Sequence, residues 1–173
     1  AGRSINLALA ARGMRALKAA GVMQALTPQL VKMRGRMLHE TGKPDQFNAY
    51  GLRSHEVIWS VSRAELTRLL TQVAADLPNV RLHFEQQCTD YLGEGTLRLK
   101  DLRTGQEHEQ HSPRIIAADG AGSILRTALC ARHAQHATEA RLPHDYKELT
   151  ISRLHQPALA MDALHIWPRG GHM

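Results

Sequence analysis

Residues 114–134 read RIIAADGAGSILRTALCARHA, and this stretch decides the fold class. An apolar run ends at Asp119, a glycine-containing turn follows, and helical periodicity begins near Ile124. A strand, a turn and a helix in succession are typical of α/β proteins. We therefore predict a mixed α/β architecture.

The same turn is a candidate nucleotide site. Asp119 stands where a strand end can bind hydroxyl groups, and the start of the following helix presents amide donors to anions. The spacing departs from a full dinucleotide fingerprint, because Leu125 stands in place of a third glycine or alanine. A structural turn with a helix cap is the alternative interpretation, and the residues of the turn leave both open.

Toward the N-terminus the sequence predicts two helices and a strand. Residues 4–20 place their apolar side chains at helical spacing, and Gly21 follows as a C-terminal cap. Residues 56–62, EVIWSVS, are typical of a buried strand. Ser62 and Glu65 then form a capping box ahead of the most regular helix of the sequence.

Most other segments are expected to be extended or polar. An extended element is expected around Met33 to Met37, and residues 41–51, TGKPDQFNAYG, are expected to be a turn-rich connection. Further strands are predicted at residues 80–84, 88–92, 96–102, 114–119, 147–154 and 163–171.

Composition excludes several classes of protein. Of the 173 residues 43% are apolar and 22% charged, as in folded domains, and the net charge is +6. The basic residues are scattered, which disfavours nucleic-acid binding, and no apolar run suits a membrane span. Cys88 and Cys130 are far apart, and His133 and His136 lack an acidic ligand in register, so no metal site is expected. Reduced thiols without a secretion signal predict a cytoplasmic protein.

Three arginines are candidates for binding anions. Arg63 falls in the first turn of a helix, where a cation is unfavourable unless it meets an anion, although an exposed, solvated arginine is the alternative. Arg34 and Arg36 alternate along an extended segment, so they are expected to share one face and to grip a carboxylate, or else to form a solvated face. No GxSxG motif is present, so no catalytic side chain is predicted and the chemistry is assigned to a bound cofactor.

Seven segments together resemble one protein family. They are GRSINLALAARGMRALKAAGV, MRGRMLH, AYG, VSRAEL, ADGAGSILR, YKELTI and LHIWPRGG. In their order and combination they resemble the kynurenine 3-monooxygenase family of FAD-dependent aromatic hydroxylases, over nearly the entire chain. VSRAEL and ADGAGSILR are similar to motifs of the wider flavoprotein hydroxylases, whereas RSINLAL, YKELTI and LHIWPRG look specific to the kynurenine enzymes.

The resemblance implies a reaction and a substrate site. NADPH reduces FAD, molecular oxygen reacts with the reduced flavin, and one oxygen atom goes to carbon 3 of the L-kynurenine ring. Arg36 looks like the family arginine that holds the substrate carboxylate, and Tyr50 looks like the tyrosine that lines the same pocket.

The resemblance also implies cofactor contacts. Arg63 resembles the arginine that meets the FAD phosphates, and Asp119 opens a motif associated with FAD and NADPH. Ala8 and the backbone near Cys88 fall where the family touches FAD, but the family's residue type is not kept at Cys88, so only a main-chain contact is expected there.

The chain departs from the family at both ends, since the first glycine-rich segment and the later C-terminal segments are missing. We expect a fragment of the flavoprotein hydroxylase fold that is inactive alone. Residues 1–30 and 61–132 are assigned to a Rossmann-like FAD domain, and residues 31–60 and 133–173 to a β-sheet substrate domain. A hydroxylase of another aromatic acid, or a non-catalytic remnant that binds a nucleotide or a partner, is the alternative function.

Overall fold

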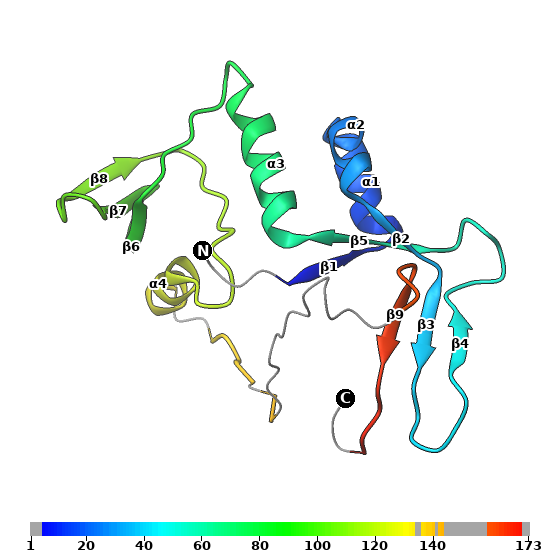
Figure 1. The fold of residues 1–173 in the computed structure, drawn as a ribbon. Coiled ribbons are helices and arrows are strands. Elements are labelled where there is room, and N and C mark those ends of the chain that lie inside the picture. The colour runs from blue at the N-terminus through cyan, green and yellow to red at the C-terminus, as the bar shows by residue number, and fades with distance from the viewer. Residues whose placement is uncertain (1–4, 134–135, 141, 144–158, 171–173) are drawn as a thin grey trace. The chain divides into compact units, whose positions relative to one another are not determined.

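The computed structural model describes residues 5–133, 136–140, 142–143 and 159–170 (Figure 1). The chain divides into two compact units, the first made of Ala1–Val80 with Tyr146–Met173 and the second of Arg81–Asp145. Each unit contains helix and strand, so the predicted α/β class is confirmed. Within the described ranges, no helix is long and apolar enough to cross a membrane.

The first unit contains an antiparallel sheet with the strand order β1-β5-β2. Its strands are β1 (Asn6–Leu9), β5 (Ile58–Ser62) and β2 (Val31–Met33). On one side of it lie α1 (Ala11–Ala19), α2 (Met23–Leu26) and α3 (Arg63–Ala75) (Figure 1). The 3-10 helix η1 (Thr27–Gln29) directly follows α2. The core between them is formed by the buried side chains of Leu26, Val61, Leu66 and Leu69.

The helix predicted over residues 4–20 is wrong at its N-terminal end, where residues 6–9 form β1. Leu7 and Leu9 alternate with exposed neighbours and pack against the core, as side chains of a half-buried strand do. Short apolar runs fit both a helix and a strand by pattern alone. Here residues 6–9 form a strand because their backbone groups pair with those of β5.

Two predicted helix boundaries are confirmed. Gly21 follows α1 with a left-handed φ of 73°, and the amide of Val22 donates to the carbonyl of Leu17 at 3.2 Å, which closes the helix in a Schellman motif. At the start of α3 the hydroxyl of Ser62 accepts from the amide of Glu65 at 3.5 Å.

A second sheet of the first unit has the strand order β4-β3-β9. Its strands are β4 (Gln46–Ala49), β3 (Gly35–Leu38) and β9 (Ala163–Ile166). β3 and β4 form an antiparallel hairpin, whereas β9 lies parallel to β3 although it is far away in sequence. Together, β3 and β2 of the first sheet confirm the extended element around Met33 to Met37, and β9 confirms the start of the last predicted strand.

Residues 46–49 correct the expectation of a connection over residues 41–51, because they form β4. The side chains of this strand are exposed on both faces, so its polar sequence carries no strand pattern. Its extended conformation is set by pairing with β3. Gly35 permits the close approach, since a Cβ atom there would lie 2.3 Å from the carbonyl oxygen of Asn48. The strand predicted at residues 147–154 lies outside the described residues.

The second unit consists of a three-stranded meander and one helix. The elements are β6 (Gln86–Gly93), β7 (Thr96–Asp101), β8 (Glu107–His111) and α4 (Ile124–Arg132). α4 packs against β6, and the strands predicted at residues 88–92 and 96–102 are confirmed. β8 was not expected, because its sequence EHEQH is polar and exposed throughout.

Two strands predicted for this unit are wrong. Residues 80–84 and 114–119 belong to no helix or strand, and no described strand pairs with them. Phe84 and Ile116 are accordingly 67% and 92% exposed. Apolar runs favour strands only where a neighbouring strand accepts their backbone hydrogen bonds.

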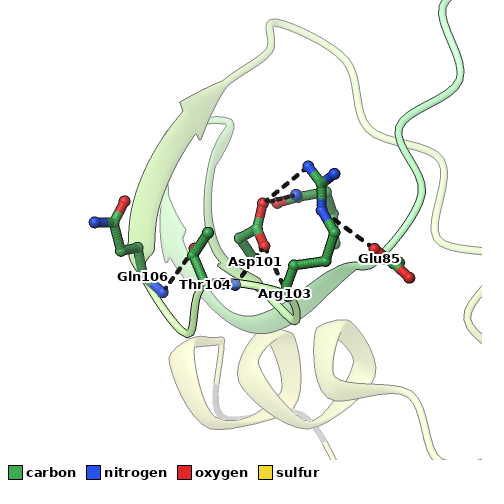
Figure 2. Close-up of polar contacts among 6 residues, drawn as sticks. Glu85, Asp101, Arg103, Thr104 and Gln106 are labelled. Atoms are coloured by element: carbon green, nitrogen blue, oxygen red, sulfur yellow. Dashed lines mark hydrogen bonds and ion pairs between the residues drawn. The ribbon is translucent and has the colours of Figure 1, made fainter.

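The turn between β7 and β8 is held by a carboxylate (Figure 2). Asp101 Oδ1 accepts from the amides of Thr104 and Arg103 at 3.0 and 2.8 Å, and these hydrogen bonds hold the pKa of Asp101 below its usual value. The Arg103 guanidinium also pairs with Glu85 at 3.2 Å, which ties the turn to the start of β6.

Candidate functional site

The structure brings together the two residues expected to bind a substrate. The guanidinium carbon of Arg36, on β3, lies 5.5 Å from the centroid of the Tyr50 ring. Tyr50 directly follows β4, and its amide donates to the carbonyl of Arg34 at 3.0 Å, which continues the hairpin. Hairpin pairing therefore sets the position of Tyr50 relative to Arg36.

This pair has unused hydrogen-bonding capacity. The Tyr50 hydroxyl oxygen is buried and has no hydrogen-bond partner among the described residues. Arg36 is exposed, and no carboxylate among the described residues forms an ion pair with it. A buried polar atom without a partner costs about 1–3 kcal/mol. A ligand that accepts hydrogen bonds would remove this penalty and meet a positive charge at the same place.

Arg34 and Arg36 do not converge on one carboxylate, so the expectation of a shared grip is wrong. The Arg34 guanidinium donates to Asp162 at 2.5 Å and lies 5.6 Å from the Phe47 ring centroid. The hydrogen bond from Arg34 lowers the pKa of Asp162. The backbone of Arg34 continues the pairing of β3, since its amide donates to the carbonyl of Asp162 and its carbonyl accepts from Tyr50, but its guanidinium is held by the Asp162 carboxylate.

Ala8 and Arg63 occupy the first sheet and the helix that leaves it. Ala8 is exposed on β1 and pairs with Ser60 of β5. Arg63 is exposed at the first position of α3, and its amide donates to the carbonyl of Ile5 at 3.0 Å. Both expected cofactor residues thus lie where β1 and β5 pair and α3 begins.

Asp119 is part of the cap of α4 in the second unit. The Ser123 hydroxyl donates to Asp119 Oδ1 at 2.7 Å and accepts from the amide of Arg126 at 3.0 Å. The hydrogen bond from Ser123 lowers the pKa of Asp119, which keeps this carboxylate ionised. The capping interpretation of this turn is therefore confirmed, and the backbone amides of Ile124 and Leu125 also stabilise the Asp119 carboxylate.

The turn before α4 borders an open hollow of about 400 Å³. Gly120 has a left-handed φ of 83°, and a Cβ atom at Gly120 or Gly122 would meet nothing within 4 Å. The backbone of the turn is thus open to close approach by a ligand. Arg126 also borders the hollow and adds a positive charge, although it is paired with Glu139.

Cys88 lies on β6, opposite Leu99. Burial is the main cause that raises the pKa of its thiol, so the reactive thiolate is disfavoured. Its sulfur lies 3.6 Å from the carbonyl oxygen of Asp90. These features do not suit a nucleophile and are consistent with the expected main-chain role.

A cluster in the second sheet was missed by sequence reasoning. The rings of His39 and Trp167 are stacked with their centroids 4.5 Å apart, and the rings of His39 and His165 are nearly parallel with their centroids 5.0 Å apart. His39 also contacts Asp45, with 2.8 Å between Nδ1 and Oδ1. The segments MLH and LHIW hold these rings, but only the parallel pairing of β3 with β9 reveals that they meet.

Comparison with known proteins assigns the chain to a family. The family model described as "FAD binding domain" matches residues 5–167. The chain belongs to the FAD-binding domain family. This membership confirms the predicted relation to the flavoprotein hydroxylases and the expectation of FAD as the cofactor.

Individual relatives of this FAD-binding domain are similar over almost its full length. Kynurenine 3-monooxygenases of Xanthomonas campestris pv. campestris (strain 8004) and Xanthomonas oryzae pv. oryzae (strain PXO99A) are each 42% identical to it over 175 residues. The enzyme of Xanthomonas axonopodis pv. citri is 42% identical over 177 residues. Each alignment covers 99% of this chain, which spans 38% of the length of these relatives. The resemblance seen in the seven sequence segments is confirmed.

Proposed function

We propose that this chain supplies FAD-binding and substrate-binding residues of a kynurenine 3-monooxygenase. The enzyme would hydroxylate L-kynurenine to 3-hydroxykynurenine in tryptophan degradation, with NADPH as reductant and molecular oxygen as the oxygen donor. The observation that carries this proposal is the contact between the exposed Arg36 guanidinium and Tyr50, whose buried hydroxyl lacks a partner among the described residues.

Arg36 and Tyr50 would together bind the carboxylate of the substrate. A carboxylate only accepts hydrogen bonds, and the guanidinium and the phenol both donate them. The planar guanidinium can present two parallel N–H groups, which fixes the direction of the carboxylate as well as its position. Because the pair recognises the acid group rather than the ring, another aromatic acid remains the alternative substrate.

Ala8, Arg63, Asp119 and the main chain at Cys88 would hold FAD. Arg63 offers a positive charge to the phosphates at a helix start, and Asp119 offers a carboxylate to a hydroxyl group. The open backbone at Gly120 supports this assignment, because a bulky side chain there would obstruct the approach. When bound, the flavin supplies the oxygen chemistry, while the protein positions the substrate.

The two functions are assigned to different parts of the chain. Residues 1–30 and 61–132 would belong to the FAD domain, and residues 31–60 and 133–173 to the substrate domain. The pairing of β3 with β9 supports this division, since it joins two segments of the proposed substrate part. Both cysteines are free thiols, which supports a reducing, cytoplasmic location.

A full-length chimera tests the proposal. In it this chain replaces the matching segment of the Xanthomonas campestris enzyme, and the unaltered enzyme is the control. We expect bound flavin in the visible spectrum, kynurenine-dependent NADPH consumption, and 3-hydroxykynurenine as the product. Turnover only with other aromatic acids would replace the substrate assignment, and bound flavin without turnover of any acid would support a non-catalytic binding protein.

A further inference from the structure

His39 links three segments of the second sheet through hydrogen bonds. Its Nδ1 lies 2.8 Å from Asp45 Oδ1, and its Nε2 lies 2.7 Å from Nδ1 of His165. His165 Nε2 in turn lies 2.9 Å from the carbonyl oxygen of Ala160. The chain of contacts therefore joins the end of β3, the turn between β3 and β4, and β9.

The number of protons in this chain follows from which atoms can donate. Both ends, the Asp45 carboxylate and the Ala160 carbonyl, only accept hydrogen bonds. Two neutral imidazoles have two ring protons, but the three contacts need three. All three contacts are hydrogen bonds only when one ring carries an additional proton, which gives the pair of His39 and His165 one positive charge.

The alternative location for that proton is Asp45. The Asp45 side chain is 62% exposed, whereas that of His39 is 14% exposed. A solvated carboxyl is a weaker base than an imidazole. The additional proton therefore belongs to the histidine pair, next to the negative charge of Asp45.

The surroundings of the pair contain charges of both signs. Trp167 stacks on His39 and presents its ring face to it. Arg169 donates to the carbonyl of His39 at 3.2 Å and opposes a second positive charge. Glu40 and Lys43 pair with each other at 2.5 Å. Asp45 is thus the carboxylate that contacts the imidazole directly among the described residues.

The histidine pair and the proposed substrate residues use opposite faces of the sheet. His165 pairs with Met37 of β3, and Met37 alternates with Arg36 along that strand. Side chains of successive strand residues point to opposite faces. The pair can therefore set the arrangement of β9 and β3 without touching a ligand bound at Arg36.

We propose that His39 and His165 share one proton and that this protonated pair positions the strand that carries Arg36. The positioning role rests on the proposed function, whereas the shared proton does not. Removal of the proton leaves two acceptors facing each other in the chain of contacts, so β9 and the β3–β4 turn lose one attachment to β3.

The Asp45→Asn variant is designed to remove the additional ring proton while it keeps the three hydrogen bonds of His39 and His165. An asparagine amide can donate to His39 Nδ1, so all three hydrogen bonds persist with two neutral rings. Nitrogen-15 NMR of histidine-labelled chain counts the ring protons. We expect three in the wild-type chain and two in Asp45→Asn. Two protons in the wild type, or averaged imidazole signals without hydrogen bonds, would overturn the shared proton.

The pH profile of kynurenine binding to the chimera tests the positioning role. We expect the affinity of the wild-type chimera to be roughly twofold to tenfold lower at high pH than at low pH, as for the loss of one hydrogen bond, and to stay level in Asp45→Asn. Equal profiles in both proteins would overturn the positioning role. A chimera that binds no kynurenine at any pH overturns the proposed function and with it the positioning role, while the proton count still decides the shared proton.

Discussion

The guanidinium of Arg36 lies over the ring of Tyr50; Arg36 belongs to one strand of a hairpin, and Tyr50 directly follows the other. For Arg36→Ala in the chimera we expect kynurenine affinity to fall roughly tenfold to a hundredfold, because a charged hydrogen-bonding pair is lost. Isothermal titration measures this effect. Arg36→Lys keeps the charge without the planar fork and should recover only part of the affinity. Lys32→Ala, a change of an exposed cation, is the control, and unchanged affinity in Arg36→Ala would refute the assignment.

Tyr50→Phe should lower kynurenine affinity without lowering the stability of the fold. The hydroxyl has no partner among the described residues, so its removal should leave the thermal unfolding midpoint unchanged or slightly higher. Kynurenine affinity should fall less than in Arg36→Ala, because one neutral hydrogen bond is lost. A clear decrease in the unfolding midpoint would show instead that the hydroxyl has a structural partner.

Arg63→Ala should weaken the binding of FAD to the chimera. If the side chain meets a phosphate, the dissociation constant should rise, and its dependence on salt should be steeper in the parent protein than in the variant. Flavin fluorescence titrations at several salt concentrations measure both quantities. Equal salt dependence would count against a phosphate contact.

The carboxyl of Asp119 should titrate below its ordinary pKa of about 3.9. Since the folded-state pKa is lowered, the associated stabilisation is fully present above the ordinary value and is lost as the pH falls through the folded value. Carbon-13 NMR of the side-chain carboxyl measures the titration. Ser123→Ala removes the donor and should return the pKa toward its ordinary value; no change in that variant would exclude Ser123 as the cause.

Cys88 should be slow to react with thiol reagents at neutral pH, because burial raises its pKa. In a Cys130→Ser background, the rate with a disulfide reagent should lie below that of free cysteine. Cys88→Ala should retain FAD in the chimera, since only the main chain is expected to contact it. Loss of flavin from that variant would assign a role to the sulfur.

Short sequence motifs predicted those parts of the fold that depend on residues close together in the sequence. The cap of α3 at Ser62 and the turn before α4 follow from short-range hydrogen bonds, and both are confirmed. Residues 6–9, 46–49 and 114–119 were misassigned, because whether such short segments form strands depends on a distant partner.

The candidate site shows the same limit. The resemblance selected Arg36 and Tyr50, and the hairpin brings them together. The alternation rule did not predict that Arg34 is held by Asp162, because these two residues lie 128 positions apart in the sequence. His39 and His165 were missed, because no local pattern signals a contact between residues 126 positions apart.

The close approach at Gly35 has a consequence for protein engineering. Since the carbonyl of Asn48 occupies the space that a Cβ atom would need, directed evolution for a new acid substrate has no freedom at this position. Libraries that vary Arg36 and Tyr50 while they retain Gly35 would preserve the hairpin and explore the specificity of the site. Libraries that randomise all three would lose most of their members to misfolding.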